Sequence, residues 1–291
     1  MTTQTATRFV SATRLSEGAG VTVHRTIGTH SLKNHDPFIM LDHFSSENPN
    51  EYLAGFPDHP HRGFNTFTYM IDGHMEHQDS MGNTGHLGPG SAQWMKAASG
   101  VIHSEMPKQE AGLMRGFQLW INLPAANKMD DPEYQEYPAE AFPIVKQDGV
   151  QLKVLVGSFA DRNSPIVDPV TGVSYFDITV QAGHPFDYEA PPDENSFIYL
   201  FEGQGTLNGK PVSPHTLVTL GGEDKAFNLN SGDNGARFIF VSGRPIREPI
   251  VQYGPFVMNS REEIEQAMRD FQSHQFVQKR AWMNRKKETV S

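Results

Sequence analysis

Two pairs of side chains in this sequence have the types and the spacing to bind a metal ion. His59 and His61 stand one residue apart in DHPHRGFNTFTYM, and His103 and Glu105 repeat that spacing in ASGVIHSEMP. Because side chains alternate across an extended chain, each pair points to one face. Three imidazoles and a carboxylate from two strands would satisfy most of an octahedral first-row metal and leave positions open for solvent or substrate. We therefore predict a metal site.

The first pair alone is a weak signal, because the chain has 13 histidines and most histidines are exposed or hydrogen-bonded. The second pair, on another predicted strand, strengthens the prediction. Pro60, between the first two histidines, fixes φ and removes a backbone donor, which is typical of an edge or bulged strand.

Other histidines lack this pattern. His74, His77 and His86 flank a glycine-rich hairpin and are expected to be exposed to solvent, because loops carry polar side chains. His184 and His215 have no partner at ligand spacing. We expect no metal site in the second half of the chain.

The elements that must position the two pairs are strands. Short runs of β-branched and aromatic residues are separated by Gly, Pro, Asn and Asp, which predicts an all-β barrel or sandwich. Two segments share one order of strand, glycine turn, polar hairpin and strand: FNTFTYMIDGHMEHQDSMGNTGHLGPGSAQWM and NSFIYLFEGQGTLNGKPVSPHTLVTLGGED. This likeness indicates a duplicated barrel. We predict a first domain over residues 1–130, a linker over 131–145 and a second domain over 146–291.

Helical periodicity begins only near the end of the chain. Ser260 is a predicted N-cap followed by acidic residues, and Ile264, Met268 and Phe271 recur at helical spacing. A terminal helix packed on the second barrel is the expected structure, with a solvated basic end.

Composition excludes several classes of function. The chain has 291 residues, with 24 basic and 34 acidic side chains and a formal charge of −10, which argues against direct nucleic-acid binding. The absence of cysteine excludes disulfides, zinc–thiolate sites and thiol catalysis. The first residues show neither a signal-peptide core nor a membrane span, so we expect a soluble, cytoplasmic protein without membrane contact.

Several long motifs resemble those of one known family. They are HPHRGF, GNTGHLGPGSAQWMKAASGVIHSEMP, QLWINLP and REPIVQYGPFVMN, and together they resemble the pirin family, a bicupin branch of the cupin superfamily, over nearly the whole chain. The resemblance implies two tandem cupin (double-stranded β-helix) barrels. It also implies an iron site in the first barrel, formed by His59, His61, His103 and Glu105, the same four residues that the spacing indicates.

Two positions depart from the general cupin pattern. Asn65 stands where a glutamate is usual, and Gln93 falls near the position of the later cupin histidine. Asn65 therefore puts the hydrogen bonds around the ligands in question. Phe64, Trp94 and Met106 would line a cavity near the metal or fill the core.

A mixed His/Glu ligand set suits Fe(II), which the resemblance favours, and would also accept Mn, Co, Ni, Cu or Zn. Members of the family resemble quercetin 2,3-dioxygenases, which implies O2-dependent opening of a flavonol or a related small phenolic or enol with release of carbon monoxide. In that reaction Glu105 is the natural base.

The alternative is an iron-binding, redox-sensing regulator that acts on a partner protein without turnover. The same four ligands serve both functions. The resemblance also suggests a monomer.

Overall fold

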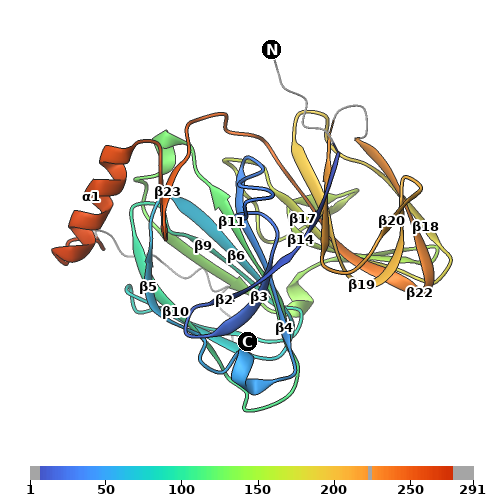
Figure 1. Ribbon diagram of the computed structural model, residues 1–291, viewed down its shortest axis with the longest axis horizontal. Coiled ribbons are helices and arrows are strands. Elements are labelled where there is room, and N and C mark those ends of the chain that lie inside the picture. Colours follow the sequence, from blue (N-terminus) through green and yellow to red (C-terminus); the bar gives the residue numbers. More distant parts are fainter. Residues whose placement is uncertain (1–6, 222–224, 278–291) are drawn as a thin grey trace, which may run out of the picture. The chain divides into compact units, whose positions relative to one another are not determined.

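The computed structural model describes residues 7–221 and 225–277; its regular structure there is mostly strand, with one α-helix (Figure 1). It confirms the predicted all-β class. The chain forms two compact units, and neither is continuous in sequence. The histidine unit comprises Arg14–Arg25, Phe38–Ala139 and Ile246–Ser291, and the companion unit comprises Met1–Thr13, Thr26–Pro37 and Glu140–Pro245.

The units therefore differ from the expected ranges 1–130, 131–145 and 146–291. The first strand, β1 (Arg8–Ser11), pairs with β21 (Thr216–Leu220) in the companion unit. The terminal helix α1 (Arg261–Gln272) belongs instead to the histidine unit. Each end of the chain therefore belongs to the unit whose distant segments it contacts, and not to the unit that is nearest in sequence.

The histidine unit is built from two antiparallel sheets. The larger has seven strands in the order β12-β9-β6-β11-β4-β3-β2, and the smaller has four in the order β5-β10-β7-β8. The strands are β2 (Thr13–Glu17), β3 (Val21–Arg25), β4 (Phe38–Ser46), β5 (Phe56–His61), β6 (Phe64–Asp72), β7 (Met75–Asp79), β8 (Thr84–Leu87), β9 (Ala92–Lys96), β10 (Val101–Pro107), β11 (Met114–Asn122) and β12 (Glu133–Tyr137), with the short pair β23 (Val251–Tyr253) and β24 (Phe256–Met258) and the 3-10 turns η1 (Pro49–Glu51) and η2 (Ala125–Asn127).

Strand β10 lies inside the smaller sheet, between β5 and β7. On one side it pairs with β5, so that His103 is opposite His59 and Val101 is opposite His61. On its other side it pairs with β7, so that Glu105 is opposite His77. Directly opposed residues of an antiparallel pair place their side chains next to each other on one face. This sheet therefore brings both predicted ligand pairs together.

Part of the expected linker is a strand of the larger sheet. β12, with the sequence EYQEY, pairs with β9 over its whole length, and Tyr134 is fully buried. Tyr134 and Tyr137 are three positions apart and therefore lie on opposite faces of the strand, and only Tyr134 is buried.

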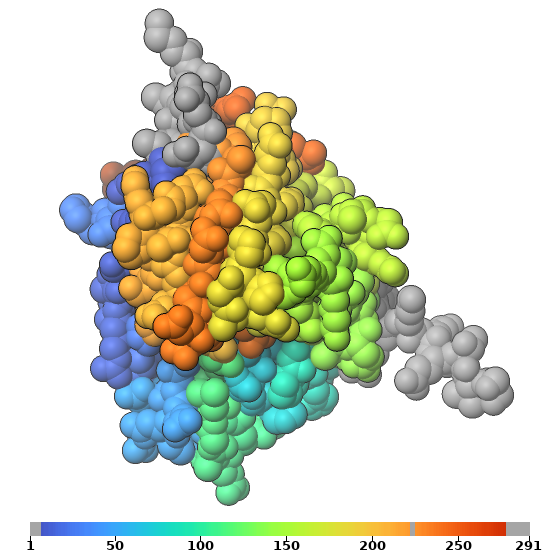
Figure 2. Space-filling view, turned by 90° about the vertical axis from the view of Figure 1, so that its right-hand side faces the viewer, coloured from blue at the N-terminus to red at the C-terminus, as the bar shows by residue number. Residues whose placement is uncertain are grey.

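The companion unit contains a nine-stranded antiparallel sheet, ordered β1-β21-β19-β22-β17-β14-β13 with β18 on β22 and β20 on β19. In Figure 2 the orange β22 lies beside the yellow β19. The further strands of the companion unit are β13 (Ile144–Gln147), β14 (Val150–Val156), β15 (Ser158–Phe159), β16 (Arg162–Asn163), β17 (Ser174–Val180), β18 (Pro185–Glu189), β19 (Asn195–Leu207), β20 (Lys210–Val212) and β22 (Ala226–Gly243). The 3-10 turn η3 (Ala139–Ala141) lies where the chain passes from the histidine unit into the companion unit. Its core is rich in phenylalanine, including Phe176, Phe186, Phe227, Phe238 and Phe240.

Helix α1 starts as the sequence predicts. The Ser260 side chain accepts a hydrogen bond from the backbone N–H of Glu263, whose own side chain accepts from the N-cap backbone, so both halves of a capping box are present. Ile264 and Ala267 are buried in a cluster with Phe256 and Phe276 of the same unit. Residues 278–287, which include the basic end predicted to follow the helix, lie outside the described residues.

A buried lysine joins three parts of the histidine unit. Lys128 Nζ donates hydrogen bonds to the carbonyl oxygen of Gly63 at 2.7 Å, to Asn122 Oδ1 at 2.6 Å and to the carbonyl oxygen of Val257 at 2.9 Å. Gly63 has a φ of +92°, and a Cβ there would lie 1.9 Å from the Val257 oxygen, so only glycine fits. Burial lowers the pKa of Lys128 to about 8. This value is still above 7, so the amine is mostly charged at neutral pH.

Within the described residues, every helix is too short or too polar to cross a lipid bilayer.

We expect the substitution Lys128→Met to lower the free energy of unfolding by about 2–4 kcal/mol, because three buried oxygens lose a charged donor. Chemical denaturation would measure the change. Lys146→Met, at an exposed position, is the matched control and should stay within about 0.5 kcal/mol of the parent protein. Equal stability of the two variants would contradict the prediction.

Candidate metal centre

Three imidazoles from β5 and β10 converge at one point. The ring centroids of His59, His61 and His103 lie 4.3–4.9 Å apart, and each ring offers a nitrogen within 4.8 Å of the others. His61 and His103 are buried, whereas His59 is partly exposed. The structure thus brings together three of the four residues predicted from spacing.

The positions of the ring nitrogens fit a first-row metal ion. His59 Nε2 and His61 Nε2 are 3.0 Å apart, and two nitrogens bound at about 2.1 Å in adjacent octahedral positions would lie about 3 Å apart. His59 Nδ1 lies 2.8 Å from the Pro57 carbonyl, which fixes its proton there and leaves the Nε2 lone pair free. His103 Nε2 is buried without a hydrogen-bond partner among the described residues, as expected for an atom awaiting a ligand.

Burial keeps two of these rings uncharged. It lowers the pKa of His61 and that of His103 well below 6.5, and the neighbouring His59 lowers both further. A metal ion binds the neutral imidazole, so little proton competition is expected at these two rings near neutral pH.

Glu105 lies next to this cluster and is held by amide and hydroxyl groups. Its ligand atom groups with those of His103 and His77 within 4.8 Å, and its side chain is buried. Glu105 Oε1 accepts a hydrogen bond from Gln93 Nε2 at 2.5 Å and lies 3.1 Å from Thr68 Oγ1. These contacts orient the carboxylate. Its group of possible ligand atoms contains those of His103 and His77 but not those of His59 or His61, so a site shared by all four predicted ligands stays a prediction.

The partners of Glu105 are themselves fixed. Tyr134 Oη lies 2.8 Å from Gln93 Oε1 and 3.1 Å from Glu136 Oε2, so these two acceptors share its one hydrogen, and the amide nitrogen of Gln93 faces Glu105. Burial raises the pKa of Tyr134 well above 10, so the hydroxyl keeps its proton. Gln93 Nε2 also lies 3.1 Å from Thr68 Oγ1. A glutamine at this position therefore has a defined task, to hold the neighbouring carboxylate.

An aromatic wall closes one side of the histidine cluster. The rings of Phe64 and Trp120 lie 5.0 and 4.9 Å from the His61 ring, and they stack on each other at 4.3 Å. Such a wall excludes water and offers a flat apolar face. Trp94 follows Gln93 in β9 and therefore points to the opposite face of that strand, where it neighbours Phe67. Asn65 likewise faces away from Thr68 and Glu105.

The expectation that His77 is exposed was wrong. His77 is fully buried in β7, and its Nδ1 lies 3.3 Å from His103 Nδ1. The glycine-rich segment around it forms the tight hairpin β7–β8, whose first strand pairs with β10. His74 and His86 are exposed, as expected.

The sequence contained a signal for His77 that was not used. His77 and Asp79 have the same i, i+2 spacing as the two predicted ligand pairs, and this spacing puts them on one face of a strand. In the sequence, Gln93 stands out only as a departure from the cupin pattern. Tyr134 gave no signal, because it lies in the expected linker.

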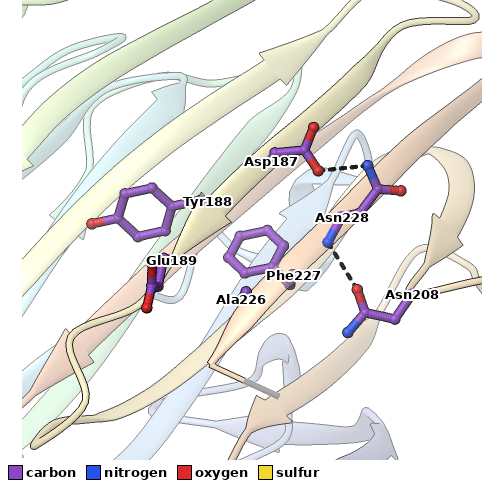
Figure 3. Close-up of a pocket in the computed structure, with 7 residues that line it drawn as sticks. All are labelled: Asp187, Tyr188, Glu189, Asn208, Ala226, Phe227 and Asn228. Atoms are coloured by element: carbon purple, nitrogen blue, oxygen red, sulfur yellow. Dashed lines mark hydrogen bonds between the residues drawn. The ribbon is translucent and has the colours of Figure 1, made fainter. Parts of the chain in front are cut away.

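A shallow hollow on the companion unit is a weaker candidate site. Its lining residues are Asp187, Tyr188, Glu189, Asn208, Ala226, Phe227 and Asn228 (Figure 3). Asn228 donates from its side chain to Asp187 and from its backbone to Asn208, both at 2.8 Å. These polar groups satisfy one another, and the lining contains no histidine.

Comparison with known families gives two matches. Residues 20–121 match the family described as Pirin, and residues 175–277 match the Pirin C-terminal cupin domain. The chain is 43% identical over 271 residues to a pirin-like protein of Caulobacter vibrioides, covering 92% of this chain and 98% of that protein. It is 38% identical over 277 residues to Pirin of Homo sapiens, covering 93% of each.

A solved structure has the same fold. Quercetin 2,3-dioxygenase from Acinetobacter baumannii superimposes with a TM-score of 0.85 at 28% identity, over 94% of this chain and 97% of that one. The predicted fold, two tandem cupin barrels with a C-terminal helix, is thereby confirmed.

We expect Gln93→Leu to weaken Ni(II) binding about 10- to 100-fold, because outer hydrogen bonds orient a metal ligand. The same change should lower the free energy of unfolding by about 1–3 kcal/mol, since the buried Glu105 carboxylate loses its amide donor. Competition with a chelator and chemical denaturation would measure the two effects. Gln78→Leu, an exposed position on β7, is the control. Wild-type nickel affinity in Gln93→Leu would contradict the assigned role.

Proposed function

Because this chain belongs to the pirin family, we propose that it is a metal-dependent dioxygenase of the quercetin 2,3-dioxygenase type. The substrate is quercetin or a related flavonol or phenolic, whose ring is opened with O2 and release of carbon monoxide. The observation that carries the proposal is the convergence of three imidazole nitrogens beside an aromatic wall. The likeness to a solved structure named quercetin 2,3-dioxygenase supports it.

In this proposal His59, His61, His103 and Glu105 hold the ion. Fe(II) is the expected metal, and the same nitrogen and oxygen donors suit Mn, Co, Ni, Cu or Zn. When bound, the ion supplies a Lewis acid with open positions for an anionic substrate oxygen and for O2.

Glu105 accepts the proton of the substrate hydroxyl. Its carboxylate is buried and held by Gln93 and Thr68, so it can be aimed at the reacting oxygen without large movement. Proton removal makes the phenolic ring electron-rich, which prepares it for attack by dioxygen. The amide of Gln93 stabilises the carboxylate before the transfer.

Trp120, which is partly exposed and stacks on the fully buried Phe64, supplies a face for a flat aromatic substrate. Its ring lies next to His61, so a substrate ring packed on Trp120 would have its hydroxyl groups near the imidazoles. His59 is partly exposed, and in this proposal a small molecule enters the site from the side of His59.

A second candidate is an iron-binding, redox-sensing regulator that binds a partner protein without turnover. The observation that favours it is the coupling of the histidine strand to helix α1. Arg62, next to His61, donates to Asp270 Oδ2 of α1 at 2.6 Å, and its guanidinium lies 4.4 Å from the centre of the Phe276 ring. In this candidate function, a movement of His61 caused by a change at the metal would be transmitted to helix α1 through Arg62. The cytoplasmic location and the monomeric state stay predictions.

We expect protein loaded anaerobically with Fe(II) to release carbon monoxide and consume O2 when given quercetin. His61→Ala should reduce both rates to the uncatalysed background, because it removes a central ligand. Gas-phase detection of carbon monoxide and an oxygen electrode would measure them, with the exposed His86→Ala as the matched control. Tight iron binding without turnover would reject the dioxygenase and favour the regulator.

A further inference from the structure

A second layer of side chains lies behind His103. His77, on the neighbouring strand β7, is fully buried, and its ring stacks on Tyr134 with centroids 4.3 Å apart and an interplanar angle of 19°. One of its nitrogens, Nδ1, is 3.3 Å from His103 Nδ1, and the other, Nε2, is 3.3 Å from Asp79 Oδ2. The three residues thus form a continuous row, Asp79–His77–His103, which we call the imidazole relay.

Asp79 is fixed at the end of this row by its own loop. Its Oδ1 accepts from the backbone N–H groups of Met81 at 2.9 Å and of Asn83 at 3.1 Å, and its Oδ2 accepts from Asn83 Nδ2 at 2.8 Å. The side chain of Asp79 is completely buried. Its carboxylate is therefore held in one place as an acceptor.

The relay specifies where the protons lie. A carboxylate only accepts, so His77 Nε2 carries the hydrogen that points to Asp79. A neutral His77 then has a lone pair on Nδ1, which can accept only if His103 Nδ1 carries a hydrogen. The lone pair of His103 is then on Nε2, the buried atom that has no hydrogen-bond partner among the described residues.

We propose that His77 and Asp79 are positioning residues that hold His103 in the tautomer whose Nε2 faces His59 and His61, and that they strengthen it as a metal donor. The inference rests on the proposed function, because it takes His103 to be a metal ligand. Outer partners of this kind orient a ligating histidine and raise its basicity.

Tyr134 also supports the carboxylate of Glu105, through Gln93. Tyr134, on whose ring His77 stacks, donates to Gln93, and Gln93 donates to Glu105. Residues from β7, β9 and β12 therefore orient both His103 and Glu105, although none of these supporting residues needs to touch the ion. A buried network whose members are all hydrogen-bonded is rigid, which suits this task.

The test compares Ni(II) affinity, measured by competition with a chelator, and the visible absorption spectrum of the Co(II)-loaded protein. We expect His77→Phe and Asp79→Asn each to weaken Ni(II) binding about 10- to 100-fold while the Co(II) spectrum keeps its intensity and shifts in energy, because the first ligands remain. His77→Gln should lose less than His77→Phe, since an amide can accept from His103 and donate to Asp79. His74→Gln and His86→Gln are the matched controls at exposed positions and should match the wild type.

Other outcomes would overturn the inference. Wild-type affinity in both Asp79→Asn and His77→Gln would show that the relay does not support the site, and Asp79→Asn keeps this test available if His77→Phe does not fold. A large change in Co(II) intensity in His77→Gln, with Asp79→Asn unaffected, would make His77 a direct ligand and reject the positioning role. Equal Ni(II) binding by wild type and His61→Ala would instead overturn the proposed metal site itself.

Discussion

The candidate site depends on the pairing of β10 with two different strands. β5 on one side contributes His59 and His61, and β7 on the other contributes His77 and Asp79. Because side chains alternate with a period of two, a slip of one residue in β10 would turn His103 and Glu105 to the opposite face and dissolve the cluster. The register of a single strand therefore holds the candidate ligands and the residues proposed to support them together.

That register is irregular at one point, and the irregularity matters for the site. The pairing of β10 with β5 shifts between His103, which is opposite His59, and Glu105, which is opposite Phe56. The extra residue lies in β5, where Pro57 and Asp58 stand against Ser104 alone, and such a bulge bends the strand that carries it, here the strand of His59 and His61. Here His103 faces the other imidazoles, whereas Glu105 is directed to Gln93 and Thr68. One strand thus contributes to two neighbouring environments, a cluster of imidazole rings and a polar network.

Local spacing in the sequence is enough to predict which side chains lie together on one face of a strand. His59 and His61 were predicted in this way together with His103, and the capping box at Ser260 was equally local. What could not be predicted depends on contacts between distant residues. Arg62 and Asp270 are 208 positions apart, and no periodicity in either segment indicates that they pair. The burial of His77 was missed for a related reason, because a glycine-rich hairpin looks exposed until the strand that covers it is known.

The non-contiguous build of the histidine unit has a consequence for the order in which the protein can mature. The segment that carries Val257, Asp270 and Phe276 closes around Gly63 and Arg62, yet it is translated after the whole companion unit. Until then Arg62 would be a charged side chain without its ion pair, and Lys128 would lack one of its three acceptors. A nascent chain on the ribosome therefore has all its candidate ligands long before it has the scaffold that fixes them.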